Sequence, residues 1–265
     1  MPTLVELRAV RKRYGWGRPW VLRDVDVGVE PGVVIEVSGA NGAGKSTLLR
    51  ILAGATLPSA GRRRAAPEVS VGYAPETLTP PPSFAAADYL GHHVRLRGLD
   101  APEGARQVEA LAQTLNFQGL LGERLDALYK GSLQKVALTQ ALLGQPSLLV
   151  LDEPFAGLDI EARAALSGLL AERARAGAAL VFSDHREAGR AQPAHRRWLL
   201  GDGQVRERAL APTASAGAPV RRTVAAAVSD GELQGMLATG WHIVEVRPSG
   251  SDEVDIAGVP PEAQS

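Results

Sequence analysis

The stretch from Gly39 to Thr47 reads Gly-Ala-Asn-Gly-Ala-Gly-Lys-Ser-Thr, and it constrains this chain more than any other segment. An apolar run at residues 33–37 precedes it, and a helical apolar pattern at residues 48–53 follows it. A buried strand, a glycine-rich turn and a helix start form a loop whose backbone N–H groups converge on phosphate, where the helix dipole also favours negative charge. The sequence therefore predicts a site for the phosphates of a nucleotide.

Each residue type in this loop has a chemical reason. Lys45 can reach the β- and γ-phosphates, and the Ser46 hydroxyl can bind Mg²⁺. Glycines leave room for close approach and tolerate positive φ. A glycine turn that merely caps a helix is the structural alternative, and the strand before the turn argues against it. The loop residues that we expect to hold the nucleotide are Gly39, Asn41, Gly42, Ala43, Gly44, Lys45, Ser46 and Thr47.

The bulk composition excludes several classes of protein. The chain has 265 residues, enough for one large α/β domain with a modest appendage or for two small domains. Lys plus Arg and Asp plus Glu balance at 29 each, so we expect no nucleic-acid partner. Cysteine is absent, which excludes disulfides and thiolate metal sites. The first residues lack a signal-peptide profile and no apolar run is long enough to span a bilayer, so we expect a soluble chain that reaches a membrane only through a partner.

Apolar patterns place the strands. Residues 4–10 and 21–29 alternate apolar and polar, which predicts an antiparallel pair of half-buried strands beside the nucleotide core. The runs 148–151 and 178–182 are continuously apolar, and the run 33–37 is apolar except for Glu36, as expected for strands covered on both faces. We expect these three strands to share one parallel sheet.

Helical patterns and turn signals fill the rest of the first 210 residues. Helices are predicted over 84–96, 102–117, 131–143 and 159–175, and the turn from Gly201 to Gly203 should join two short strands. The first three helices form an insert, at about residues 78–145, in a domain that spans residues 1–210. The interval from Lys45 to Glu76 is short, so Arg62 to Arg64 are predicted to lie in a tight, solvated turn.

A small-residue linker at 211–219 separates this domain from a C-terminal appendage at 220–265. The appendage reads as a β-α-β unit, with strands at 220–228 and 241–246 and a helix that ends near Gly240. Residues after Pro248 are predicted to be loosely ordered.

A second apolar strand ends in Asp152 and Glu153, where nucleotide hydrolysis needs two carboxylates with different duties. Asp152 would hold the Mg²⁺ shell, and Glu153 would polarise the attacking water. Taken alone, an apolar run followed by Asp-Glu is equally compatible with a strand end and a solvated acidic turn.

Further motifs resemble those of the ATP-binding cassette family. Residues 128–138 (LYKGSLQKVAL) and 146–154 (PSLLVLDEP) resemble its signature helix and Walker B strand at the expected spacing. Phe155 to Asp159 resembles its D-loop, and Ser183 to His185 its H-loop. The similarity covers roughly residues 4–208, with the motifs in family order. It implies an α/β fold: a P-loop NTPase parallel sheet with an antiparallel β subdomain and a helical insert, here followed by the small appendage.

The resemblance also implies roles for residues outside the phosphate loop. His185 would hydrogen-bond the γ-phosphate and the attacking water, whereas His92, His93, His195 and His242 have no such context and read as surface or packing residues. Tyr14 matches the aromatic residue that stacks on adenine, with Trp16 as its rival and a purely structural aromatic as a further alternative.

Two departures from the family pattern stand out. Glu76 occupies the place of the usual glutamine, where a carboxylate can still bind Mg²⁺ or its water. In the signature, Tyr129 replaces the serine that donates to the γ-phosphate of the opposite subunit's nucleotide, Lys130 replaces the first glycine, and Ser132 replaces the glutamine. We expect Lys130, Gly131 and the helix dipole to carry this recognition, at a slower turnover. Alternatively, Tyr129 points away and Ser132 or Lys130 substitutes for the serine.

The implied function is that of an ATP-hydrolysing motor subunit of a membrane transporter, with ATP and Mg²⁺ as cofactors. Two partners are expected. One is a second nucleotide-binding subunit, identical or homologous, in a head-to-tail dimer in which Asp159 of the D-loop contributes to nucleotide binding. The other is a separately encoded transmembrane permease. Its coupling helices would dock near Glu76 and residues 80–96, which places the chain in the cytoplasm on the inner face of the membrane. The single-cassette layout resembles exporters more than importers. A soluble ATPase and a regulatory subunit with weak hydrolysis are the alternatives.

Overall fold

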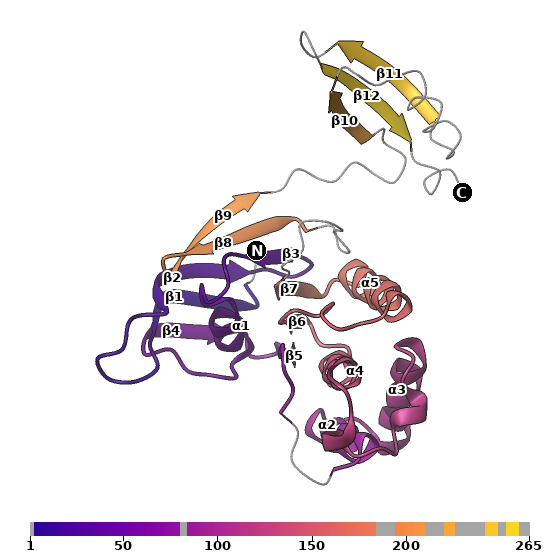
Figure 1. The fold of residues 1–265 in the computed structure, drawn as a ribbon. Helices are drawn as coiled ribbons and strands as arrows, with labels where there is room; N and C mark the ends of the chain where they lie inside the picture. The colour runs from indigo at the N-terminus through magenta and orange to yellow at the C-terminus, as the bar shows by residue number, and fades with distance from the viewer. Residues whose placement is uncertain are drawn as a thin grey trace. The chain divides into compact units, whose positions relative to one another are not determined.

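The computed structural model describes residues 3–79, 84–183, 194–209, 220–225, 242–248 and 253–259 (Figure 1). The chain divides into two compact units, residues 1–211 and 212–265. None of the helices in the described residues is long and apolar enough to cross a membrane.

A six-stranded sheet forms the centre of the first unit. Its strand order is β5-β6-β7-β3-β8-β9. The bounds are β3 Val34–Ser38, β5 Val71–Ala74, β6 Leu148–Leu151, β7 Ala179–Ser183, β8 Arg196–Gly201 and β9 Gln204–Ala209. All pairings are parallel except that of β8 with β9, which the predicted turn at Asp202 joins. Every residue of β6 and β7 is buried, as the continuous apolar runs predicted, and the prediction of one parallel sheet is confirmed.

A second, antiparallel sheet has the strand order β2-β1-β4. Its strands are β1 Val5–Lys12, β2 Leu22–Val29 and β4 Ala60–Ala65. The buried faces of β1 and β2 share one apolar cluster with β3 and with helix α1, Lys45–Ala53. The predicted antiparallel pair is therefore confirmed, and it packs against the phosphate-loop helix.

The prediction for Arg62 to Arg64 was wrong. These residues lie in β4, which pairs with β1 from Val5 to Arg11, and not in a tight turn. Arg63 is partly buried, and its Nε and Nη2 donate to the carbonyl oxygen of Leu52 at 3.0 and 2.9 Å. Leu52 is in the last turn of α1, where the backbone N–H groups of the C-cap reach Arg50 and Ile51, and Arg63 supplies the donors to the Leu52 carbonyl oxygen.

The helical part contains α2 Ala86–Leu96, α3 Ala101–Thr114 and α4 Lys130–Leu142, with short 3₁₀ turns η1 Gln118–Leu120 and η2 Leu125–Ala127. Figure 1 shows α2 to α4 grouped on the side of the central sheet away from β1, β2 and β4. Together with α5, Ile160–Arg175, they build the second apolar cluster. These four helices match the four predicted ones to within three residues at each end.

The C-terminal unit contains three described strands, β10 Val220–Ala225, β11 His242–Pro248 and β12 Glu253–Val259. Their order is β10-β12-β11, and both pairings are antiparallel. The expectation of loose order after Pro248 is wrong for β12, which is the central strand of this sheet. The predicted helix and the predicted linker lie outside the described residues.

Candidate functional site

The phosphate loop connects β3 to α1 with a left-handed backbone, which favours glycine, at two positions. Gly42 and Gly44 have φ of +78° and +105°. At Gly39 a Cβ atom would lie 2.4 Å from the carbonyl oxygen of Leu200, so the loop also depends on close backbone packing against β8. The predicted role of glycine in this loop therefore matches the conformation.

Lys45 is the first residue of α1 and is buried, with 7% of its surface exposed. Its Nζ donates to the carbonyl oxygens of Gly39 and Ala40, at 2.8 and 3.3 Å. These two bonds satisfy a buried ammonium group and hold it on the loop itself. The cation is thus in place where an incoming anion would meet the loop's N–H groups.

A pocket of about 500 Å³ opens beside this loop. It gathers residues from five separate segments of the sequence, which the fold alone brings together. Its lining residues are Tyr14, Val21, Asn41, Gly42, Gly44, Lys45, Ser46, Thr47, Glu76, Asp152 and Glu153. Gly39 and Ala43 belong to the same loop without lining the pocket. Nine of the residues predicted from separate motifs as nucleotide or metal contacts, and the predicted catalytic Glu153, therefore share one cavity surface.

Asp152 and Glu153 follow β6, at the carboxyl edge of the parallel strands, where the phosphate loop also follows β3. Both are buried, and Glu153 has φ of +50°, a conformation that a non-glycine residue adopts only when its surroundings hold it there. The side chain of Gln134 in α4 donates to the Glu153 carbonyl oxygen at 3.4 Å. The strained backbone thus coincides with the residue predicted to polarise water.

Ser183 is a site residue that the sequence analysis placed in the H-loop motif without giving it a role. It ends β7, the strand between β6 and β3. Its Oγ accepts the Glu153 N–H at 2.9 Å and donates to Oδ1 of Asp152 at 2.8 Å. The signal that could have identified it is a polar residue at the end of a strand that is otherwise wholly apolar. One hydroxyl therefore fixes both the carboxylate of Asp152 and the backbone of Glu153.

The residues present fit a magnesium ion. Oδ2 of Asp152 is buried and has no hydrogen-bond partner in the part of the chain that the structure describes. The Ser46 hydroxyl and the Glu76 carboxylate line the same pocket. All three donors are hard oxygens, the ligand type that Mg²⁺ prefers. Ser46, Glu76 and Asp152 thus remain the predicted metal-binding set.

Tyr14 and Trp16 differ in their surroundings. The Tyr14 hydroxyl is 3.2 Å from Oγ1 of Thr47, and the ring lines the pocket. Trp16 is 94% exposed and does not line it, and its ring lies 5.0 Å from the guanidinium of Arg13. This geometry favours Tyr14 over its rival as the contact for a base.

The signature residues lie apart from the chain's own pocket. Tyr129 is the N-cap of α4 and is 88% exposed, and Lys130, Gly131 and Ser132 form the first turn of the helix. None of these four lines the pocket, and neither does Asp159. Their predicted contact with nucleotide therefore requires a second molecule.

The histidines complete the comparison with the sequence. His185 lies outside the described residues. His195 has a packing role, because its side-chain Nδ1 accepts the backbone N–H of Val34 at 3.2 Å. The backbone N–H of His195 donates to the Val34 carbonyl oxygen at 2.8 Å.

A family model described as ABC transporter matches residues 22–156, just over half of the chain. The chain belongs to the ABC transporter family. The matched segment contains the phosphate loop, the signature turn (residues 129–132) and the Asp152–Glu153 pair in one domain. As an ATP-binding subunit of this family, the chain is an ATPase that uses ATP with Mg²⁺, as its sequence predicted.

Curated relatives and solved structures agree with this assignment. The zinc import ATP-binding protein ZnuC of Halorhodospira halophila is 38% identical over 183 residues, 69% of this chain and 68% of the relative. ZnuC 2 of Hahella chejuensis is 38% identical over 143 residues, 54% of this chain and only 57% of the relative. A solved ATP-binding subunit of an ABC transporter superposes with a TM-score of 0.70 at 29% identity, covering 78% of this chain and 90% of that one.

Proposed function

We propose that this ABC subunit is the ATP-hydrolysing motor of a transporter and that it works as a head-to-tail dimer coupled to a separately encoded permease. The pocket that joins Lys45 and Ser46 to Asp152 and Glu153 carries the proposal. It brings a cation and N–H donors together with two buried carboxylates, the combination that phosphoryl transfer to water requires.

The roles follow from the positions. Lys45 and the loop N–H groups bind the β- and γ-phosphates, and Tyr14 stacks on the base. Glu153 orients the attacking water and accepts its proton, with His185 as the predicted contact to the γ-phosphate. When bound through Ser46, Asp152 and Glu76, Mg²⁺ would supply positive charge that offsets the phosphate oxygens.

A dimer follows from the separation of pocket and signature turn. Because Lys130, Gly131 and Ser132 do not line their own pocket, they can contact a nucleotide only on another subunit. In a head-to-tail arrangement each phosphate loop faces the partner's signature turn and its Asp159. Either a second copy of this chain or a homologue meets this requirement.

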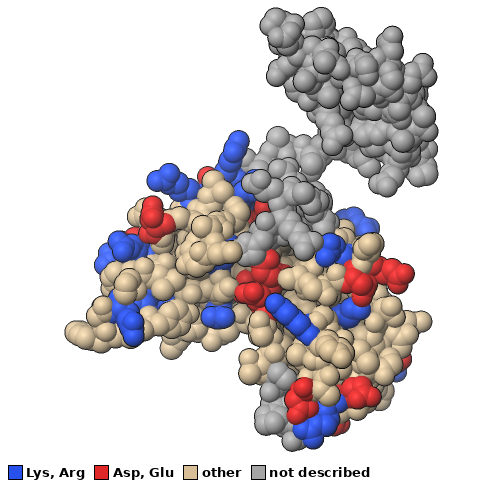
Figure 2. All heavy atoms as spheres, in the orientation of Figure 1, with Lys and Arg blue, Asp and Glu red and all other residues tan. Residues whose placement is uncertain are grey.

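The permease is expected to dock on the helical part. A shallow pocket of about 380 Å³ lies on α2, between Phe84 and Arg95, in the region predicted to receive coupling helices. Docking there would place the chain in the cytoplasm, peripheral to the membrane. Figure 2 shows basic and acidic residues interspersed on the visible face, and not one continuous basic surface of the kind that nucleic acid would need.

The direction of transport and the cargo are open to experiment. The expectation of export rests on the single-cassette layout with its appendage. The names of the relatives, which specify zinc import, favour uptake of a divalent metal instead. ATP-dependent Zn²⁺ movement in vesicles that contain this subunit and its permease would decide between the two directions.

The motor role is tested with Glu153→Gln, and Glu109→Gln on the exposed surface of α3 is the control. We expect E153Q to lose turnover by about 100-fold or more while it still binds ATP and forms a dimer that gel filtration detects. E109Q should behave as wild type. Wild-type hydrolysis at full rate by a strict monomer would contradict the dimer. Co-purification with an integral membrane protein separates a transporter from a soluble ATPase, and equal rates for E153Q and wild type would favour a regulatory subunit.

A further inference from the structure

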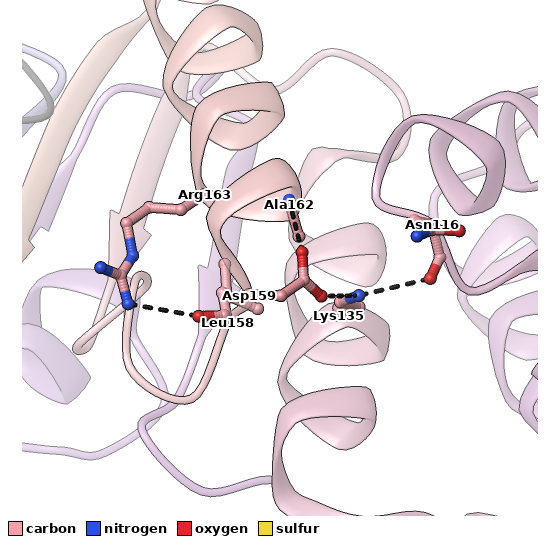
Figure 3. Close-up of polar contacts among 6 residues, drawn as sticks. All are labelled: Asn116, Lys135, Leu158, Asp159, Ala162 and Arg163. Carbon is pink, nitrogen blue, oxygen red and sulfur yellow. Dashed lines mark hydrogen bonds and ion pairs between the residues drawn. The ribbon is translucent and has the colours of Figure 1, made fainter.

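Lys135 is a buried cation on the signature helix to which the proposed function assigns no role. It lies in the second turn of α4 with 7% of its surface exposed. Its Nζ donates to Oδ2 of Asp159 at 2.8 Å and to the carbonyl oxygen of Asn116 at 3.3 Å (Figure 3). A buried ammonium group must have such partners, and its removal would take this donor away from Oδ2 of Asp159 and from the Asn116 carbonyl oxygen.

The same face of α4 contacts the D-loop, residues 155–159, one turn earlier. Gly131 and Lys135 are four residues apart and therefore lie one above the other on the helix. A Cβ atom at Gly131 would be 2.5 Å from the carbonyl oxygen of Gly157, so the helix and the loop touch through their backbones there. The signature turn, residues 129–132, thus contains a backbone contact with the D-loop, and one helical turn later Lys135 forms an ion pair with Asp159, the last residue of the D-loop.

Both carboxylate oxygens of Asp159 are engaged within the chain. Oδ1 accepts the N–H of Ala162 at 2.7 Å, which caps α5, and Oδ2 accepts from Lys135. The hydrogen bond from Lys135, followed by that from the Ala162 backbone, lowers the pKa of Asp159. Nη2 of Arg163 also donates to the carbonyl oxygen of Leu158 at 3.2 Å (Figure 3). The end of the D-loop is therefore fixed from two sides.

We propose that Lys135 is a positioning residue that holds the D-loop in register with the signature turn, so that one subunit presents both to the partner's nucleotide as a single surface. The inference rests on the proposed dimeric ATPase. It predicts that loss of the Lys135 charge impairs hydrolysis by the assembled dimer and leaves nucleotide binding at the chain's own phosphate loop intact, because Lys135 is not part of that pocket.

The test compares Lys135→Met, Lys135→Arg and Asp159→Asn in the full chain. The exposed ion pair of Arg106 with Glu103 on α3, 2.6 Å long, provides the control Arg106→Met. The measurements are kcat, KM for ATP, the affinity for a fluorescent ADP analogue with Mg²⁺, and the thermal midpoint. We expect K135M and D159N to lower kcat by about tenfold or more, with ADP affinity within about twofold of wild type. K135R should recover most of the rate, and R106M should match wild type.

Three outcomes would overturn the inference: wild-type kcat in K135M, a parallel fall in kcat and ADP affinity, and no recovery in K135R. Because D159N is nearly isosteric, it decides the question if K135M does not fold. A wild-type chain that hydrolyses no ATP would count against the proposed function and not against the link between Lys135 and Asp159. The two failures are thus distinguishable.

Discussion

The Ser183 hydroxyl donates to Oδ1 of Asp152 across 2.8 Å, at the carboxyl edge of two neighbouring parallel strands. Oγ of Ser183 also accepts the Glu153 N–H, so this single hydroxyl bridges the two acidic residues. Partners of this kind orient ligands without touching substrate. The geometry of the acidic pair therefore depends on a residue from a different strand.

Replacement of Ser183 by alanine should lower kcat by about 10- to 100-fold, the usual cost of removing a group that orients a metal ligand. We also expect the Mg²⁺ concentration for half-maximal activity to rise, because Asp152 would be free to turn. Steady-state ATPase assays across a Mg²⁺ series measure both effects. Ser167→Ala on α5 is a serine control that lies outside the pocket, and an S183A enzyme with unchanged kcat and Mg²⁺ dependence would contradict this role.

Tyr129→Ser should raise the steady-state turnover of ATP by about threefold or more. Tyr129 is the N-cap of α4 and makes no side-chain cap hydrogen bond, whereas serine would supply both a helix cap and the family's donor to the γ-phosphate. The cap alone would stabilise the chain by about 1 kcal/mol, so thermal unfolding is measured beside kcat. A higher thermal midpoint with an unchanged or lower kcat would show that Lys130 or Ser132 already substitutes for the serine.

Tyr14→Ala should weaken ATP binding by about tenfold, since stacking of a base on an aromatic ring contributes roughly 1–3 kcal/mol. Tyr14→Phe keeps the ring and should bind nearly as wild type, and Trp16→Ala should have little effect because its ring does not line the pocket. Tripolyphosphate, which lacks a base, should bind Y14A and wild type alike. Isothermal titration would reject this assignment if W16A were the weaker binder of ATP.

Arg63→Met should destabilise the chain by about 1 kcal/mol, because the Leu52 carbonyl oxygen at the end of α1 would lose two donors. The adjacent Arg62 is exposed, so Arg62→Met should change the free energy of unfolding by no more than about 0.5 kcal/mol. Denaturant unfolding of both variants makes the comparison. Equal effects would show that charge on β4, and not the helix end, is what matters.

The sequence alone determined the features that are local in the chain. Glycine, lysine and hydroxyl residues at fixed spacing define the phosphate loop from Gly39 to Thr47, because a short loop between a strand and a helix has few backbone solutions. The continuous apolar runs identified β6 and β7, since burial on both faces removes the alternation of polar and apolar residues, and the run at 33–37, which only Glu36 interrupts, identified β3. The resemblance to the family then assigned roles to the motifs that follow the phosphate loop.

Only the tertiary structure decided which distant residues meet. Ser183 lies 30 residues from Glu153 along the chain and Lys135 lies 24 residues from Asp159, yet each pair shares a hydrogen bond or an ion pair. Strand order and helix packing set these meetings, and no local pattern encodes them. The same holds for Arg63, where an isolated run of arginines indicates solvent and only the register of β4 against β1 brings the middle one to the end of α1. Local spacing therefore specifies the chemistry that a site can contain, whereas long-range packing specifies which groups orient it.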